Sequence, residues 1–176
     1  GKTTFSKRLS THLKINGLKP VTISVDDYFV ERINCPKDAN GEYDFECLEA
    51  IDLKLLNKHL TDLKNGRKID LPKYDFETGT RIENHRSLHL EDNQLLIVEG
   101  IHCLNDELTK SIPLQDKYKI YISALTQLSI DDHNGISTTD ARILRRLIRD
   151  HKYRNYSASE TLNRFPAVIQ GEKKHI

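Results

Sequence analysis

The first four residues, Gly1-Lys2-Thr3-Thr4, have the types and the order that bind a phosphate group. They match the second half of the phosphate-binding loop G-x-x-x-x-G-K-[ST] and stand directly before an amphipathic stretch. In such a loop, glycine lets the backbone approach the phosphates, and N–H groups at the helix start favour anions. Lys2 would reach the β- and γ-phosphates of a nucleotide, and the Thr3 hydroxyl would bind Mg²⁺. The alternative is an ordinary helix start, because the first glycine and the preceding strand are absent.

Acidic residues follow two short apolar runs. Asp26 and Asp27 directly follow the apolar run of residues 21–25, and Glu99 directly follows the run of residues 95–98. Such runs are typical of buried parallel strands, and ligands bind at the carboxyl ends of these strands. Asp26 could accept the proton of an acceptor hydroxyl and help to order Mg²⁺, and Glu99 could bind Mg²⁺ directly or through water. The alternatives are an Asp pair that caps a turn and a strand-end carboxylate that meets solvent.

A strongly basic segment lies near the end of the chain. Residues 139–153 are predicted to form a helix, and the cations of this helix and just after it are Arg142, Arg145, Arg146, Arg149, Lys152 and Arg154. Guanidinium groups suit phosphate oxygens because they donate in a fixed fork, so the segment could be a lid that supplies charge to a transferring phosphoryl group. The alternatives are a solvated charged face and a nucleic-acid surface. The formal net charge of +1 disfavours the latter.

The elements that must position these residues follow from apolar periodicity and turn residues. Helices are predicted over residues 4–15, 47–63 and 139–153, and strands over 21–25, 69–71, 81–90, 95–98 and 118–122. Gly17 and Gly66 are expected to end the first two helices, and Ser157 and Glu160 have the spacing of a capping box that opens a last helix. Residues 131–138 are predicted to be a polar loop. Strands that alternate with helices indicate an α/β domain with a parallel sheet.

The composition restricts the class of protein. The chain has 176 residues, of which 37% are hydrophobic and 30% charged, which suits one globular domain. No apolar run reaches the length of a membrane helix, so we expect neither a membrane nor a nucleic acid as partner. Three cysteines without a C-x-x-C pair argue against zinc and fit a reducing cytosol, so a cytoplasmic protein is predicted. A homo-oligomer is left open.

Six motifs in a fixed order carry a resemblance to a known family. They are GKTTFSKRLS, VDDYF, YDFE, LPKYDFETGTR, LLIVEGIH and DARILRRLIRD. Over essentially its whole length, the chain resembles the uridine kinase and phosphoribulokinase family of P-loop kinases, and bacterial uridine kinase-like proteins in particular. The resemblance implies a P-loop NTPase-type parallel sheet flanked by helices, a small β-hairpin insertion over the acceptor pocket and an arginine-rich helical lid. It also implies that residues 1–176 are a single kinase domain, truncated within the P-loop and at the C-terminus.

The resemblance implies ATP and Mg²⁺ as cofactors and the 5′-hydroxyl of a nucleoside as the acceptor. Gly1, Lys2, Thr3 and Thr4 would bind the nucleotide, together with the lid residues Arg149 and Arg154. Lys2, Asp26 and Arg149 would be catalytic, with Asp26 as the general base. Thr3, Asp26 and Glu99 would hold the metal. Tyr28, Glu46, Tyr74, Phe76 and Arg146 would bind the acceptor, with Glu46 standing where the family has an aspartate.

One position departs from the family pattern. Gly79 stands where uridine-cytidine kinases have a histidine that reads the pyrimidine edge, and glycine has no side chain to donate a hydrogen bond. His85 lies nearby in the sequence, but nothing places it in the pocket. Two alternatives therefore stay open beside a nucleoside kinase: a kinase of another hydroxyl substrate, such as a sugar phosphate or a pantothenate-like molecule, and a nucleotide-binding regulatory domain with little turnover.

Overall fold

A parallel strand pair forms the centre of the fold. The computed structural model describes residues 1–39, 41–123, 131 and 135–175. Strand β1 (Lys19–Ser24) pairs in parallel with β4 (Gln94–Glu99), and the register sets Ser24 opposite Glu99. The predicted strands 21–25 and 95–98 are thus confirmed to within a residue or two at their ends. Because the strands are parallel, their carboxyl ends, and the acidic residues there, meet at one edge.

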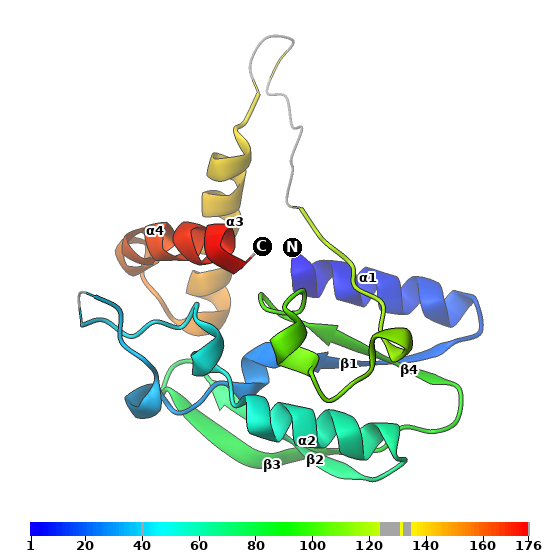
Figure 1. Ribbon diagram of the computed structural model, residues 1–176. Helices are drawn as coiled ribbons and strands as arrows, with labels where there is room; N and C mark the ends of the chain where they lie inside the picture. Colours follow the sequence, from blue (N-terminus) through cyan, green and yellow to red (C-terminus); the bar gives the residue numbers. More distant parts are fainter. Residues whose placement is uncertain (40, 124–130, 132–134, 176) are drawn as a thin grey trace.

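Helix α1 (Lys2–Ile15) packs against β1 and β4 (Figure 1). It ends as the sequence predicts: Gly17 has φ +81°, and the N–H of Leu18 donates to the carbonyl of Leu13 at 3.0 Å. This is the left-handed termination that favours glycine. The short link to β1 brings the chain straight back along the helix, so the start of α1 lies near the carboxyl edge of the strands.

Helix α2 (Leu53–Lys64) begins later than the predicted residue 47. The side chain of Asp52 accepts a hydrogen bond from the N–H of Leu55 at 2.9 Å and so fixes the first turn. The residues before it form a 3₁₀ turn, Leu48–Ala50, and Ile51 makes an antiparallel bridge with Phe29. Apolar spacing alone extended the prediction across this segment, where the backbone pairs with another part of the chain.

Strands β2 (Ile69–Asp75) and β3 (Thr80–Leu88) form the predicted hairpin. The pairing is antiparallel and irregular between Leu71 and Lys73. Pro72 lies at this point and has no N–H to donate to the ladder. The hairpin and α2 lie together on the side of β1 and β4 that α1 does not cover (Figure 1).

The strand predicted over residues 118–122 is wrong. The segment has no regular structure, and Tyr118 is 90% exposed. A strand needs a neighbour that satisfies its backbone N–H and C=O groups. Among the described residues β4 pairs with β1 alone, so apolar character in this segment is not enough to form a ladder.

The basic segment forms helix α3 (Thr138–Arg154), followed by α4 (Ala158–His175). Ser137 caps α3 by accepting from the N–H of Asp140, and Asn155 ends it with φ 54°. The predicted capping box is present: Glu160 N–H donates to Ser157 Oγ at 3.2 Å, and Ser157 N–H donates to Glu160 Oε2 at 2.8 Å. Part of the predicted loop 131–138 lies outside the described residues.

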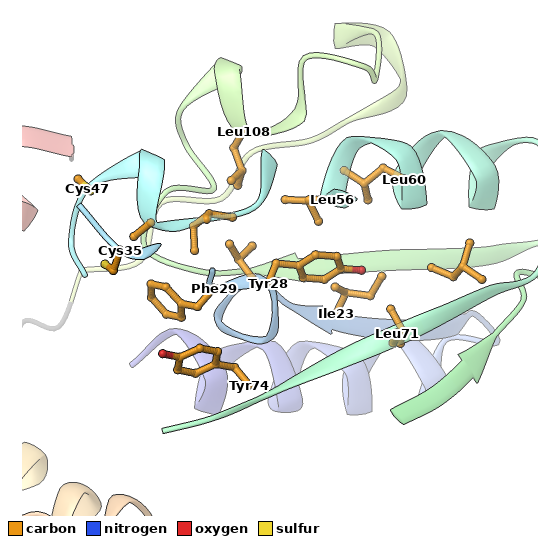
Figure 2. Packing of buried hydrophobic residues seen from close by; sticks show 14 of the residues in the cluster. Ile23, Tyr28, Phe29, Cys35, Cys47, Leu56, Leu60, Leu71, Tyr74 and Leu108 are labelled. Carbon is orange, nitrogen blue, oxygen red and sulfur yellow. The ribbon is translucent and has the colours of Figure 1, made fainter. Parts of the chain in front are cut away.

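The main core lies between α2, the end of β1 and the hairpin. Figure 2 shows Ile23 and Tyr28 between Leu56 and Leu60 of α2 and Leu71 of β2. Burial of these apolar side chains stabilises the fold and fixes the end of β1 against the hairpin. In the described part of the chain, no helix has the length and apolar character needed to cross a membrane.

Candidate active site

The first turn of α1 is tied to the carboxyl ends of both parallel strands. The Thr3 hydroxyl donates to Glu99 Oε1 at 2.9 Å, and the Ser24 hydroxyl donates to the same oxygen at 3.3 Å. Gly100 permits this junction because a Cβ at its position would lie 2.7 Å from Cβ of Val25. The need for glycine here is close approach rather than a special φ angle. One carboxylate thus joins three separate parts of the sequence.

The electrostatics of Glu99 reveal its other neighbours. Burial is the main cause that raises the pKa of Glu99 above its usual range, and the negative charge of Asp26 adds to it. Hydrogen bonds from Thr3 and Ser24 and the charge of Lys2 act in the opposite direction. Four of the predicted residues, Lys2, Thr3, Asp26 and Glu99, therefore lie in one region. A cation bound beside Glu99 would favour the charged form of the carboxylate and so lower this raised pKa.

Cys103 lies in the same region, which the sequence did not indicate. Burial raises the pKa of its thiol to about 12, with smaller effects of Glu99 and Asp26 in the same sense and of Lys2 in the opposite sense. A thiol with such a pKa stays protonated at neutral pH and is a poor nucleophile. Cys103 is therefore a packing residue beside the site.

Asp26 and Asp27 have separate surroundings. Asp27 Oδ1 forms an ion pair with Lys73 Nζ of the hairpin at 2.9 Å, and its side chain is 20% exposed. Asp26 is 41% exposed, and its Oδ2 lies 3.7 Å from Nη2 of Arg154. Asp27 thus holds the hairpin against the end of β1. Asp26 faces the lid and has accessible surface for a substrate.

A buried acid that sequence reasoning missed organises the lid. Asp150 Oδ1 accepts a hydrogen bond from Nε of Arg149 at 2.8 Å, and Nη2 of the same guanidinium lies 2.7 Å from this oxygen in an ion pair. Arg146 Nε lies 3.4 Å from Asp150 Oδ2, and Arg154 Nη1 lies 3.8 Å from Oδ1. The three arginines that the sequence singled out are thus brought together by one carboxylate. The only signal was an acid inside a run of cations.

The C-terminal end of the lid lies on the hairpin. The guanidinium of Arg154 stacks over the ring of Phe76 at 4.2 Å, and Asn155 Nδ2 donates to Glu77 Oε1 at 3.4 Å. Arg154 therefore contacts both Phe76 and Asp26. The end of α3, the hairpin and the residue after β1 therefore meet at Arg154.

Predicted acceptor residues Tyr74 and Phe76 belong to an aromatic cluster. Their ring centroids are 5.1 Å apart, and both rings pack on Phe29, at 5.4 and 6.1 Å. Phe29 was not predicted, whereas Tyr28 was. Tyr28 has 0% exposure, and its hydroxyl is 3.0 Å from Nδ1 of His59 in α2, so it is a core residue with no surface for a substrate (Figure 2). The burial of Tyr28 thus gives no support to its predicted contact with the acceptor.

Glu46 and Arg146 lie near one another, as the resemblance implied. The charge of Glu46 raises the pKa of Arg146, against a larger lowering caused by burial and by Arg149. Glu46 also packs against α4, because a Cβ at Gly171 would lie 2.7 Å from Cβ of Glu46. An acidic and a basic side chain are thus available on the acceptor side of the lid.

Gly79 closes the hairpin with φ +75°. A Cβ at this position would lie 2.5 Å from Nε of Arg32. Arg32 itself donates from its backbone N–H to the carbonyl of Gly79 at 2.9 Å and from Nη2 to the carbonyl of Phe76 at 2.8 Å. Gly79 therefore leaves room for the Arg32 side chain, which occupies the space beside the turn. Sequence reasoning missed Arg32.

A cleft of about 230 Å³ opens between the end of β1 and the hairpin. Its walls include Ser24, Asp27, Lys73 and His85. Asp26, Tyr74 and Phe76 are not among the lining residues, so this cleft is adjacent to the predicted site rather than identical with it. His85 lines this cleft and lies away from the turn at Gly79.

The donor set at the strand ends fits a hydrated Mg²⁺ beside a nucleotide. Mg²⁺ prefers oxygen and is usually held by one or two carboxylates together with phosphates and water. Thr3, Glu99, Asp26 and Ser24 offer hydroxyl and carboxylate oxygens, and residues 1–4 are exposed at the start of α1. Within the described ranges there is no cluster of three or more His, Cys, Asp or Glu residues suited to a metal, so phosphate oxygens would have to complete the coordination.

A family model, curated relatives and a solved structure all relate this chain to uridine kinases. The model of the Phosphoribulokinase / Uridine kinase family matches residues 1–176. Uridine kinases of Staphylococcus aureus strains JH9 and Newman are 28% identical over 170 residues, which cover 97% of this chain and 72% of each relative. A possible uridine kinase from Bacillus stearothermophilus superposes with a TM-score of 0.51 at 29% identity. That match covers 61% of this chain and 58% of the solved chain.

Proposed function

We propose that this chain, which belongs to the phosphoribulokinase and uridine kinase family, transfers the γ-phosphoryl group of ATP to the 5′-hydroxyl of a nucleoside. Membership of this family makes the chain an ATP-dependent kinase. The nucleoside and the roles of individual residues are the proposed part. In this proposal, residues 1–176 are one kinase domain.

The observation that carries the proposal is the pair of hydrogen bonds on Glu99. They join the start of α1, through Thr3, to the ends of β1 and β4, and bring Lys2 and Asp26 into the field of the same carboxylate. In such sheets, nucleotides bind where the N-terminus of a helix lies beside the carboxyl ends of the parallel strands. Phosphoryl transfer requires position and charge above all, and this corner supplies both.

Each residue then has a definite task. Backbone N–H groups at Gly1–Thr4 and the Lys2 ammonium bind the β- and γ-phosphates. Thr3 and Glu99 would hold Mg²⁺, which when bound neutralises phosphate charge. Asp26 accepts the proton of the acceptor hydroxyl as the oxygen attacks phosphorus. Arg149 and Arg154 stabilise the charge on the transferring group.

Phe76 beside Arg154 supports an acceptor with a flat ring. It is the partly exposed member of an aromatic cluster whose other rings, Phe29 and Tyr74, are buried, and the named relatives are uridine kinases. Glu46 and Arg146 offer an acceptor and a donor to the hydroxyls of a sugar. Flat rings bind by stacking on aromatic side chains, whatever the base.

A second candidate is a kinase of a phosphorylated sugar. Two observations favour it: Gly79 provides no side chain to read a base, and Arg154 sets a cation 3.7 Å from Asp26. A guanidinium at that place would suit an acceptor that carries its own phosphate.

A panel assay distinguishes the two. The full-length protein is incubated with ATP, Mg²⁺ and one acceptor at a time, from a set of nucleosides and sugar phosphates, and ADP formation is followed. Uridine and cytidine should give kcat/KM at least about tenfold above any sugar phosphate, a difference of about 1.4 kcal/mol in transition-state binding. A sugar phosphate as the best acceptor would replace the first proposal with the second.

A further inference from the structure

Asp150 has an unusual position for an acid in a basic helix. Its side chain is 3% exposed, although it lies one turn from the end of α3. A carboxylate removed from water needs compensating partners, and Asp150 has three guanidinium groups around it. The closest, Arg149, donates from Nε to Oδ1 and holds Nη2 in an ion pair with the same oxygen, and Arg146 lies nearest the other oxygen.

The backbone of the same residue fixes the end of the helix. The carbonyl of Asp150 accepts from the N–H of Asn155 and from the N–H of Tyr156, the latter at 3.2 Å. Asn155 adopts a left-handed φ of 54° to make this termination. Arg154 lies between Asp150 and this turn. Side chain and main chain of Asp150 therefore both determine where Arg154 points.

The charge balance leaves the arginines able to bind phosphate. One carboxylate cannot neutralise three guanidinium groups, and Arg149 keeps 44% of its side chain exposed while its Nε–H donates to Asp150. Arg149 also lowers the pKa of Arg146 and of Arg154, after burial, so the cations repel one another. Without the carboxylate this repulsion would drive them apart.

We propose that Asp150 is a positioning residue of the lid, which gathers Arg146, Arg149 and Arg154 into one cluster aimed at the phosphoryl-transfer site. The direction follows from Arg154, whose Nη2 lies 3.7 Å from Oδ2 of Asp26. The inference rests on the proposed function, because it gives the cluster transferring phosphate as its ligand. Asp150 itself contacts no substrate and acts through the arginines.

Asp150→Asn and a matched control test this role in the full-length protein. Asparagine keeps the shape and removes the charge. Asp140→Asn makes the same change at an exposed position in the first turn of the same helix. For Asp150→Asn, kcat should fall about tenfold to a hundredfold and the KM for ATP should rise about fivefold, because the gathered arginines bind the phosphates both before and during transfer. Asp140→Asn should match the wild type, and equal kcat in both variants would overturn the inference.

A double-mutant cycle separates positioning from simple support of the helix. If Asp150 acts through Arg149, then Asp150→Asn should cost much less in an Arg149→Ala background than in the wild type. Effects on kcat that multiply independently would refute a shared role. Should Asp150→Asn not fold, the cycle is run with Asp150→Glu, which keeps the charge and displaces the carboxylate.

Binding of inorganic tripolyphosphate keeps this test separate from the proposed function. Affinity is measured by calorimetry on the wild type, Asp150→Asn and Asp140→Asn, with no acceptor present. Asp150→Asn should bind at least about fivefold more weakly than the other two, because its arginines are no longer held together. If the wild type phosphorylates no acceptor in the panel, the proposed function fails, and this affinity alone decides the inference on Asp150. Equal affinity would then overturn it.

Discussion

The phosphate-binding corner and the lid–hairpin contact are built in different ways. The corner joins the start of α1 to two paired strands through hydroxyl–carboxylate bonds at 2.9 and 3.3 Å, above a backbone ladder. The lid meets the hairpin through side chains alone among the contacts described: Arg154 lies over Phe76, and Asn155 donates to Glu77. Arg154 also lies 3.7 Å from Asp26, which follows β1.

This difference suits two stages of a kinase reaction. A corner fixed by main-chain pairing can keep its geometry while nucleotides exchange. Exposed side-chain contacts contribute little individually and can be broken and remade when an acceptor enters. The comparison therefore predicts that changes at the corner affect the chemical step strongly and that changes at the lid–hairpin contact affect acceptor binding weakly.

Asp26→Asn should have the largest effect, because Asp26 belongs to both regions. Asparagine keeps the shape but cannot accept the acceptor proton, and general-base catalysis contributes about 10²–10⁴-fold. We expect kcat to fall within that range at saturating ATP, with the thermal midpoint nearly unchanged. Asp27→Asn is the matched control. It removes an ion pair to Lys73 and should lower kcat by less than about threefold. If Asp27 is the more damaging site, the base is Asp27.

Glu99→Gln should produce opposite effects on activity and on stability. The amide oxygen can still accept from Thr3 and Ser24, but it binds Mg²⁺ less well, so kcat should fall about tenfold to a hundredfold. The folded protein raises the pKa of Glu99, so it binds a proton more readily than the unfolded chain does. Stability therefore falls as pH rises from the ordinary glutamate pKa through the raised one.

Thermal unfolding between pH 4 and pH 8 measures this second effect. Glutamine does not titrate, so Glu99→Gln should lose part of the decline that the wild type has across this window. At neutral pH the variant should be at least as stable as the wild type. A variant that is less stable at pH 7 and shows the same pH dependence would mean that Glu99 is structurally required in its charged form.

Arg149→Ala should lower turnover about tenfold and should also lower the free energy of unfolding by about 1–3 kcal/mol, because it removes the hydrogen-bonding partner of the buried Asp150 carboxylate. Arg149 is the most exposed of the three arginines on Asp150, and the variant leaves Asp150 with two partners. Steady-state kinetics and thermal unfolding are compared with those of Arg142→Ala on the same helix. Normal turnover in Arg149→Ala would return this helix to a solvated charged face.

A site residue could be predicted where its position depends on neighbouring residues in the sequence rather than on distant parts of the chain. Thr3 and Glu99 were identified because a helix start and the end of an apolar strand are local signals, and parallel strands bring their ends to one edge. Tyr28 was predicted for the acceptor pocket because the family resemblance implied it, but the 3₁₀ turn Val25–Tyr28 leaves this side chain with 0% exposure in the core.

Asp150 and Arg32 escaped prediction for another reason. Their significance depends on side chains that only the folded chain brings near: Arg32 on the turn at Gly79, and Asp150 within its arginines at the end of α3. Residues 118–122 fail for the same cause, since pairing needs a neighbour that the segment itself does not specify. A sequence pattern indicates a helix or strand, but the residues or strands that contact it are determined by the folded chain.

Phe76→Leu should have the smallest effect and tests the lid–hairpin contact directly. Leucine keeps apolar packing against Tyr74 but removes the ring face on which Arg154 stacks at 4.2 Å. A partly buried cation–π pair of this kind contributes on the order of 1 kcal/mol, so the KM for the acceptor should rise about threefold to fivefold, with kcat within twofold. Tyr153→Leu removes a similar pair with Lys152, at 5.3 Å on an exposed part of α3, and is the control. A fall in kcat as large as that of Arg149→Ala would show that this contact belongs with the fixed corner, because Arg154 would then depend on Phe76 during the chemical step itself.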